Sequence, residues 1–364
     1  MALTDLSELQ PLKGRGAAEN PGNRFEQMLV ELDPDAIEDL RVSDPDFEIR
    51  RPKTVFFRDD SQSIISRNSS PDLGFDASLN PYRGCEHGCS YCYARPYHEY
   101  LGFSAGLDFE TKIMVKENAP ELLERELSSP KWTPQTLACS GVTDCFQPVE
   151  RKLEITRRCL EVLAKFRNPV TVVTKNHLVT RDIDHLKQLA ADGACSVALS
   201  ITTLDPKLAA KLEPRASSPE YRLRAIEELS AAGIPTVVSV APIIPGLNDH
   251  EIPAILSAAA ERGATRAFYV ILRLPHGVSE LFMAWLDRHE PGRREKIEGR
   301  IREMRGGQLN DSTFKTRMKG EGALAAEISA LFRVAAHRAG LNRDRIKLNT
   351  DSFRKPGGIQ LQLF

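Results

Sequence analysis

From residue 77 onward, short apolar runs alternate with segments of helical periodicity, and this alternation constrains the fold more than any other feature. The apolar runs are rich in valine, isoleucine and alanine, as expected for parallel strands covered on both faces. Between them, apolar residues recur every three or four positions, which predicts helices. Strands are predicted over residues 77–83, 136–142, 169–174, 196–202, 235–244 and 266–272, and helices over residues 119–127, 153–166, 182–191, 219–232 and 250–262.

Six such βα units predict an α/β protein, either a partial (β/α)6 TIM-like barrel or a doubly wound sheet. A complete barrel of this class contains eight units, so two are missing for closure. In both architectures the working side chains follow the strands and gather at their C-terminal ends. We therefore expect the polar residues after each apolar run to lie together at one edge of the sheet.

Charge divides the chain into three predicted parts. Residues 1–80 carry nine Lys and Arg against sixteen Asp and Glu, whereas residues 291–364 carry sixteen against eight. The predicted parts are an acidic flexible N-terminal arm over residues 1–50, a core over residues 51–275 and a basic helical extension over residues 276–364 that ends in a short apolar tail. In the extension, helices are predicted over residues 279–288, 293–305 and 324–339.

The composition is that of an ordinary globular chain, with 41% hydrophobic and 27% charged residues. No apolar run is long enough for a transmembrane helix, and the N-terminus lacks the pattern of a signal peptide, so a cytoplasmic location is predicted. Seven cysteines form an odd set, and three of them lie within eight residues. In a reducing compartment this pattern favours metal binding over disulfides.

The three clustered cysteines are Cys85, Cys89 and Cys92, with the spacing Cys-x3-Cys-x2-Cys. Thiolates are soft ligands suited to zinc, copper(I) and iron–sulfur clusters, and three of them leave one coordination site open. Gly84 and Gly88 allow the backbone to curl around a bulky group. A zinc site is the alternative, with a histidine as fourth ligand, either His87 or His98. Zinc motifs usually come as two separated pairs, and the chain has no second pair.

This spacing, with aromatic Tyr91 immediately before the last cysteine, resembles the signature of the radical S-adenosylmethionine (SAM) superfamily. The resemblance covers roughly residues 75–275 and implies a partial (β/α)6 barrel. It also implies that Cys85, Cys89 and Cys92 bind three irons of a [4Fe–4S] cluster and that SAM chelates the fourth. Reductive cleavage of SAM then gives a 5′-deoxyadenosyl radical that abstracts a hydrogen atom from the substrate. An electron donor such as flavodoxin or ferredoxin is implied as a partner.

The same resemblance suggests where SAM binds. The backbone of Tyr91 is expected to face the adenine, and Asp144 after the second strand is expected to accept the SAM ammonium, although a helix N-cap is the alternative role for this aspartate. Lys175 is expected to meet the SAM carboxylate or a substrate phosphate. Further cofactor contacts are expected at the ends of the fourth strand and beyond, from Ser200, Thr202, Glu213 and Arg215.

The string SGVTDCFQPVE over residues 140–150 is similar to bacterial proteins grouped with spore photoproduct lyase, often described as DNA-repair photolyase-like. The lyase reaction requires a thiol that returns a hydrogen atom to the product radical. In this chain the corresponding position falls on Gly141, a departure from the lyase pattern. Cys139 and Cys145 flank this region and are the candidate hydrogen donors.

We therefore predict a radical SAM enzyme, of lyase type, that repairs or modifies nucleic acid. Alternatives are a radical SAM enzyme acting on a peptide or small metabolite, and a non-catalytic metal-bearing nucleic-acid-binding module. The basic extension predicts DNA contacts, for example from Arg305 and Arg317. The last five residues, from Gln360 to Phe364, resemble the peptide by which bacterial repair proteins dock on the sliding clamp, and packing on the barrel is the alternative for this tail.

Overall fold

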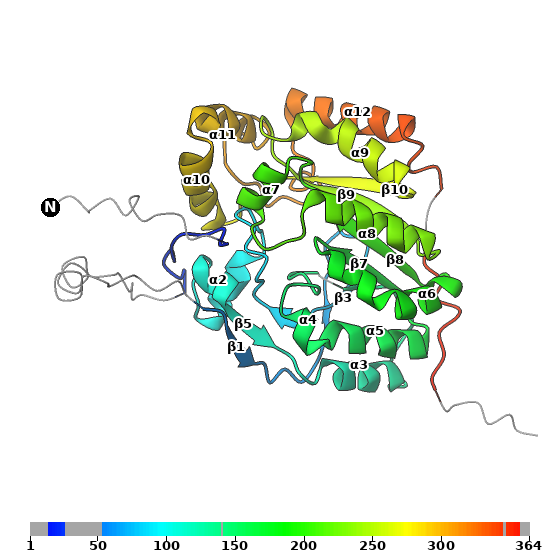
Figure 1. Cartoon of the computed structure of the whole chain (residues 1–364). Coiled ribbons are helices and arrows are strands. Elements are labelled where there is room, and N and C mark those ends of the chain that lie inside the picture. The colour runs from blue at the N-terminus through cyan, green and yellow to red at the C-terminus, as the bar shows by residue number, and fades with distance from the viewer. Residues whose placement is uncertain (1–13, 26–52, 140, 345–346, 357–364) are drawn as a thin grey trace, which may run out of the picture.

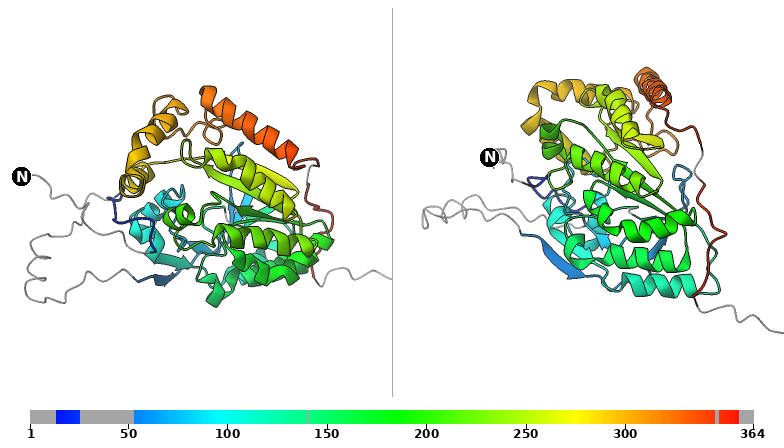
Figure 2. Two further views of the ribbon diagram at one scale, coloured as in Figure 1. Left: turned by 45° about the horizontal axis from the view of Figure 1, so that its top comes forward. Right: turned by 45° about the vertical axis from the view of Figure 1, so that its right-hand side comes forward.

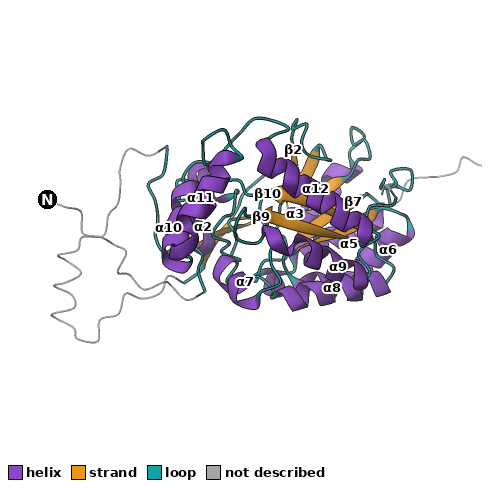
Figure 3. Cartoon of the chain, turned by 90° about the horizontal axis from the view of Figure 1, so that it is seen from above, coloured by secondary structure: helices purple, strands orange, loops and turns teal. Residues whose placement is uncertain are grey.

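The computed structural model describes residues 14–25, 53–139, 141–344 and 347–356, and its centre is a curved sheet of seven strands. Six strands are parallel, and they follow one another across the sheet in chain order (Figure 1). Figure 3 shows the strands in the interior with helices around them. This order is that of a partial (β/α)6 barrel and not of a doubly wound sheet, whose strand order reverses near its middle. The strands are β3 (Ala77–Leu79), β6 (Leu137–Cys139), β7 (Val170–Thr174), β8 (Cys195–Ser200), β9 (Thr236–Ile243) and β10 (Arg266–Ile271).

The predicted helices are present between these strands and cover the outer face of the sheet. They are α3 (Ala119–Ser128), α5 (Ile155–Phe166), α6 (Ile183–Ala191), α8 (Pro219–Ala231) and α9 (Ile252–Glu261). Because the sheet is covered, all six residues of β8 are buried, and the apolar side chains of sheet and helices form one continuous core. The predicted α/β barrel is therefore confirmed, and element ends differ from the prediction by only a few residues.

Local sequence explains where one of these units starts and stops. Ser218 is the N-cap of α8, and Pro219 occupies the first helical turn, where a missing N–H costs no hydrogen bond. The helix ends just before Gly233, whose φ of +78° is a conformation that favours glycine and turns the chain into β9.

A second sheet of three short strands lies beside the barrel and was absent from the sequence prediction. It consists of β1 (Val55–Arg58), β5 (Lys112–Val115) and β4 (Tyr82–Arg83), in the order β1-β5-β4. All four residues of β1 are exposed, so its apolar run does not mark a core strand. This small sheet positions the cysteines, because Cys85 follows β4 almost directly and β5 continues from the short helix α2 (Leu107–Thr111).

The C-terminal part of the chain adds three helices, α10 (Val278–His289), α11 (Arg294–Glu303) and α12 (Gly322–Arg338). Helix α12 packs on α9, while α10 and α11 pack on one another (Figure 2). Between α11 and α12, residues 311–319 cross the open side of the barrel, and we call this segment the clasp.

The clasp joins the two edges of the sheet that the partial barrel leaves unpaired. On one side, the amide of Ile271 in β10 donates to the carbonyl of Met318 at 2.9 Å. On the other side, Arg317 Nε lies 2.6 Å from Asp72, in the loop between β3 and its antiparallel edge neighbour β2 (Ile65–Arg67). The barrel is thus closed by an irregular segment in place of the missing strands.

Some predicted features lie outside the described residues. These are most of the N-terminal arm, including residues 1–13 and 26–50, and the tail from Gln360 to Phe364. The described part of the arm, residues 14–25, is packed against the core, as set out below. Within the part of the chain that the structure describes, no helix is both long and apolar enough to cross a membrane.

Candidate functional site

The three clustered cysteines lie on one tightly curled loop. Gly84 and Gly88 have φ values of +80° and +65°, and such left-handed turns allow the backbone to reverse between the cysteines. Cys85 and Cys89 are each only 7% exposed. They belong to two separate clusters of buried apolar side chains, and Cys92 packs against both clusters. Burial raises the pKa of the Cys92 thiol to about 11, so an iron that binds it has to displace a proton.

The donor set fits a cluster better than a single ion. Among the described residues, no group of three or more His, Cys, Asp or Glu side chains converges on a position for one metal ion. A [4Fe–4S] cluster does not need that convergence, because each thiolate binds a different iron. Of the candidate fourth zinc ligands, His87 lies between Asp144 and Asn176 and also hydrogen-bonds to Cys85, whereas His98 Nε2 is 2.9 Å from the carbonyl of Lys112. Three thiols are the donor set that a cluster requires, so the residues present fit that group.

A buried arginine, Arg95, fixes the backbone of the cysteine loop. The side chain of Arg95 is fully buried and donates to the carbonyl of Cys89 from Nε at 3.0 Å and from Nη2 at 2.8 Å. Its charge is balanced by Glu110, also fully buried, at 2.5 Å. Breaking such a buried pair by removing one partner typically costs about 3–5 kcal/mol, so this pair fixes the position of Cys89 firmly.

Residues 14–17 of the N-terminal arm close the same network, and we call this segment the strap. The amides of Gly16 and Ala17 donate to the two carboxylate oxygens of Glu110, at 3.1 and 2.8 Å. Gly16 lies so close to the cysteine loop that a Cβ atom there would be 1.7 Å from the carbonyl oxygen of Gly88. The strap was predicted as part of a flexible arm; instead, its buried residues are tied to the carboxylate that positions the loop.

Polar residues after the parallel strands meet at one edge, as predicted. Asp144 follows β6, and its carboxylate accepts from the Phe146 amide, the Thr174 hydroxyl and the Lys175 amide at 2.8–2.9 Å. It also lies 3.3 Å from His87 Nδ1, and these partners hold its pKa below the usual range although burial opposes this. Asp144 therefore ties β6 and β7 to the cysteine loop, and the predicted contact with the SAM ammonium has to compete with four partners.

A second carboxylate lies beneath Cys89. Glu213 is 2% exposed and accepts from the Thr202 hydroxyl at 2.5 Å and from the hydroxyl of Tyr91. Burial acts to raise its pKa, but Arg222 and Lys175 outweigh burial and hold that pKa well below the usual range. This cluster brings together four predicted cofactor contacts, namely Tyr91, Lys175, Thr202 and Glu213.

The remaining predicted contacts lie around this cluster. Arg215 points back to the cysteine loop, where its Nη2 is 2.9 Å from Glu86 and its amide donates to the carbonyl of His87 at 3.2 Å. Ser200 is buried at the end of β8, and its carbonyl accepts from Arg222 at 3.0 Å. The direct roles of these residues toward SAM stay predictions.

The two candidate hydrogen donors point away from this edge. Cys139 and Cys145 are at most 1% exposed and belong to the core between the sheet and its helices. Cys139 lies close enough to Cys159 of α5 to affect the pKa of that thiol, which burial raises. Both thiols are therefore buried in this core, and their role as hydrogen donors stays a prediction.

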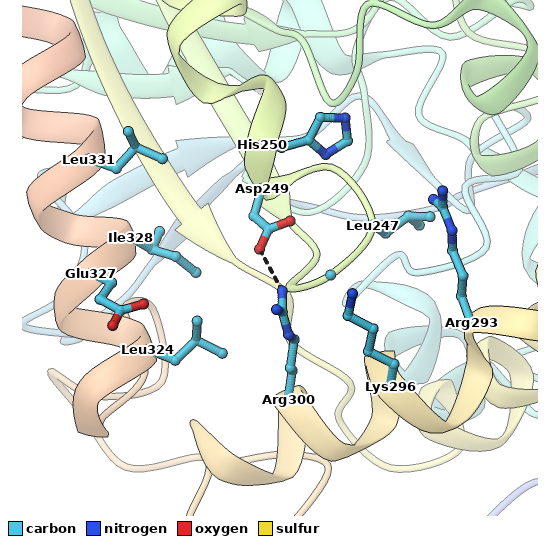
Figure 4. Close-up of a pocket in the computed structure, with 11 residues that line it drawn as sticks. Leu247, Asp249, His250, Arg293, Lys296, Arg300, Leu324, Glu327, Ile328 and Leu331 are labelled. Atoms are coloured by element: carbon cyan, nitrogen blue, oxygen red, sulfur yellow. Dashed lines mark hydrogen bonds and ion pairs between the residues drawn. The ribbon is translucent and has the colours of Figure 1, made fainter.

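A cavity of about 520 Å³ lies between the loop that follows β9 and the helices α11 and α12 (Figure 4). It is lined by apolar side chains of α12, including Ile328 and Leu331, and by cations of α11 and its N-cap, Lys296 and Arg293. Arg300 also lines it and forms an ion pair of 3.2 Å with Asp249. The end of the loop that follows β9, from Gly246 to Asp249, thus lines this cavity together with the C-terminal helices.

Sequence reasoning missed the residues that hold the cysteine loop. Arg95, Glu110 and Arg222 make no recognisable motif, because the separations to their partners follow no common pattern, from six residues for Arg95 and Cys89 to 95 for Glu110 and Arg15. One available signal was the glycine-flanked arginine of the string GRG over residues 14–16, which stands out in an otherwise irregular segment.

Comparison with known proteins agrees with this arrangement. A family model described as the radical SAM superfamily matches residues 79–259. An uncharacterised protein of Mycobacterium tuberculosis is 36% identical over 234 residues, which are 64% of this chain and 68% of that protein. A radical SAM Nα-GlyT isomerase of Pseudomonas phage M6 is 30% identical over 203 residues, covering 55% of this chain and 40% of the isomerase.

Among solved structures, spore photoproduct lyase complexed with dinucleoside spore photoproduct has a similar fold. The TM-score is 0.57 at 15% identity, and the match covers 79% of this chain and 80% of the lyase. At this identity the likeness concerns the fold.

Proposed function

The chain belongs to the radical SAM superfamily, whose enzymes use a [4Fe–4S] cluster and SAM, and we propose that Cys85, Cys89 and Cys92 hold that cluster here. The observation that carries the proposal is the curled loop itself, which brings three cysteines together in one short segment, with Cys92 packed against the apolar clusters that contain Cys85 and Cys89. The exclusive use of thiols is the chemistry that iron–sulfur clusters require.

The protein's own residues prepare this loop for its task. Arg95 and Glu110 fix the carbonyl of Cys89, while Asp144 and His87 connect the loop to the ends of β6 and β7. Lys175, which lies 3.3 Å from Glu213 and 3.0 Å from the carbonyl of Ala241, presents a cation at the barrel mouth. That cation is suited to a carboxylate such as that of SAM.

When bound, the cluster and SAM supply reductive cleavage of SAM and hydrogen-atom abstraction from a substrate. We propose that the substrate is nucleic acid and that the reaction is radical repair or modification. Support comes from the fold shared with a lyase that was solved with a dinucleoside, and from the isomerase of a phage. A lyase-type outcome is part of this proposal.

The test is anaerobic reconstitution with iron and sulfide, followed by reduction in the presence of SAM. The expected result is a brown protein that releases 5′-deoxyadenosine, and Cys92→Ala is expected to abolish that release, since it removes one iron ligand. Gly74→Ala is the matched control, because a Cβ at this glycine would contact nothing. Release by the Cys92 variant at the wild-type rate would contradict the ligand assignment.

The substrate is tested in the same reaction by deuterium transfer. Oligonucleotides deuterated at the thymine methyl group, with and without ultraviolet lesions, are compared with deuterated peptides. Deuterium in 5′-deoxyadenosine from the oligonucleotides supports the proposal. Deuterium only from peptides would show that the enzyme acts on another class of substrate.

A further inference from the structure

Arg273 follows β10 at the barrel mouth and lacks the partners that a half-buried arginine normally has. Its Nε is buried and makes no hydrogen bond to the described residues. The one hydrogen bond of its side chain in that part of the chain is a long contact from Nη1 to the sulfur of Met318, at 3.8 Å. No carboxylate among the described residues forms an ion pair with it, so its charge is not neutralised by any of them.

Other buried arginines of this protein show what Arg273 lacks. Arg95 and Arg222 each bind a buried glutamate, and Arg305, which is 5% exposed, donates to the carbonyls of Leu272 and Thr316. Arg305 therefore holds the clasp and is not available for the phosphate contact that its sequence position suggests. A buried cation without a partner is costly, so an uncommitted one calls for an explanation.

The surroundings of Arg273 combine positive charge with aromatic faces. Its Cζ lies 5.5 Å from the ring centroid of Tyr93, which follows the cluster cysteine Cys92 and is 42% exposed. Tyr93 reaches across the mouth, where its hydroxyl donates to the carbonyl of Gly141 beyond β6 at 3.0 Å. Tyr97 is 55% exposed and is near enough to act on the charge of Arg273.

Arg317 of the clasp also lies near Arg273, but it is already paired. It binds Asp72 and Ser70 and stacks on the exposed ring of Phe314, with Cζ 4.6 Å from the ring centroid. Burial and the charge of Arg317 lower the pKa of Arg273 and outweigh the opposing effects of Tyr93, Tyr97 and Asp72. An anion that entered the mouth would meet a guanidinium group that has no ion-pair partner among the described residues.

We infer that Arg273 is the anion anchor of the substrate site, and that it binds a phosphate of a single-stranded nucleotide segment whose bases stack on Tyr93 and Tyr97. This inference rests on the proposed function, because it assigns one contact of the proposed nucleic-acid substrate. A guanidinium group can donate to two oxygens of one phosphate, which is the geometry of a bidentate pair. Exposed aromatic faces beside such a cation are typical of sites for unpaired bases.

The test measures binding of a fluorescein-labelled single-stranded oligonucleotide to the reconstituted protein over a series of salt concentrations. For Arg273→Gln we expect an affinity loss of about tenfold or more, since charge-assisted hydrogen bonds are lost. The slope of log affinity against log salt should also become shallower by about 0.7, the value for one phosphate contact on a single strand. A purely structural role would leave that slope unchanged.

Arg333→Gln is the matched control, because Arg333 is an exposed cation on the outer helix α12 and its loss removes the same charge. It should retain both the affinity and the slope. Arg273→Lys keeps the positive charge but loses the planar guanidinium group that can bind two phosphate oxygens. It should therefore retain the slope of log affinity against log salt and lose affinity. This variant also supplies the comparison if Arg273→Gln does not fold.

The outcomes separate the two proposals. If the wild-type protein binds with a clear salt slope and Arg273→Gln binds equally well with the same slope, the anchor is refuted while the nucleic-acid function stands. Equal affinity of Arg273→Lys and wild type would refute the bidentate contact. If the wild-type protein does not bind the oligonucleotide, or binds it without regard to salt, the nucleic-acid function and the anchor both fall.

Discussion

At the scale of single residues, the cysteine loop depends on a glycine that lies almost seventy residues before it. Gly16 is required for a steric reason, because its Cα faces the carbonyl of Gly88 at a distance that leaves no room for a side chain. Its amide and that of Ala17 then satisfy Glu110, which in turn neutralises Arg95. The absence of a side chain at Gly16 therefore allows a series of contacts that runs through Glu110 and Arg95 and ends at the carbonyl of Cys89.

Gly16→Ala is expected to displace the strap and weaken this chain of contacts. Inserting a methyl group into a packed region typically costs about 1–3 kcal/mol, and here the neighbour is backbone that cannot rotate away. The variant should unfold at a lower temperature and lose iron to a chelator several-fold faster than wild type. Gly74→Ala, where a Cβ meets nothing, should do neither. Equal rates of iron loss from the two variants would show that the strap does not stabilise the cysteine loop.

His98 predicts a pH dependence of stability. Burial lowers its pKa to about 4, while its ring packs edge-on against Phe109. Because the folded pKa lies below the unfolded value of about 6.5, the unfolded state binds the proton more tightly. The stability is therefore complete above about pH 6.5 and declines as the pH falls toward 4, by about 2 kcal/mol at pH 5.

The measurement is urea unfolding between pH 7.5 and 5 for wild type and His98→Phe. The phenylalanine variant should be less stable at neutral pH, because it leaves the carbonyl of Lys112 without its donor. It should also show a flatter dependence on pH, since the titrating ring is gone. Parallel curves for the two proteins would assign the pH effect to other groups.

At the scale of elements, the clasp takes the place of the strands that a complete barrel would have. It is held to β10 by the Met318 carbonyl and to the loop before β3 by the pair of Arg317 and Asp72. Both members of this pair are largely buried, with side chains 15% and 5% exposed. A segment with so little regular structure depends on such specific contacts for its position.

A double-mutant cycle on Arg317→Gln and Asp72→Asn should therefore reveal a coupling of about 1–2 kcal/mol in the free energy of unfolding. Either single variant should also expose residues 311–319 to faster proteolysis, since the clasp loses its ion pair to the loop before β3. The pair of Arg262 and Glu220, which is exposed and joins two outer helices, is the matched control and should couple by less than about 1 kcal/mol. Additive effects at the clasp would mean that other contacts hold it.

The elements differ in how well sequence predicts them, and the reason is the range of the interactions involved. Strands such as β7 and β9 and the helices around them follow local periodicity, so their positions could be predicted. The small sheet could not, because β1 is exposed and β4 has only two residues. Likewise, the spacing of Cys85, Cys89 and Cys92 is local, whereas the partners of Glu110 and Arg95 are set by folding.

At the scale of the whole molecule, the cysteine loop connects to distant parts of the barrel through backbone hydrogen bonds. The amide of Ser90 donates to the carbonyl of Leu212 in α7 (Pro206–Leu212), and the amide of Cys85 donates to that of Phe109 in α2. The thiols of Cys139 and Cys145 lie in a different layer, the core toward α5. The molecule thus separates a region coupled to the cluster site from a helical layer that is not.

Removal of iron is predicted to affect these two regions differently. A metal group that binds only the folded state adds its binding free energy to folding, and its loss is felt first where its ligands are attached. Amide hydrogen exchange of the iron-depleted protein should therefore be faster in residues 82–111 and 206–216, by about tenfold or more, whereas α5 and α6 should keep their protection. The comparison is made by mass spectrometry on reconstituted and chelator-treated protein. A uniform increase over the whole chain would indicate global destabilisation, and no increase near Cys85 would mean that these thiols do not carry the cluster.

The strap should respond to iron removal together with the cysteine loop, because Gly16 and Ala17 are bound to Glu110. The amides of these two residues should therefore also exchange faster, although they lie almost seventy residues before Cys85 in the chain.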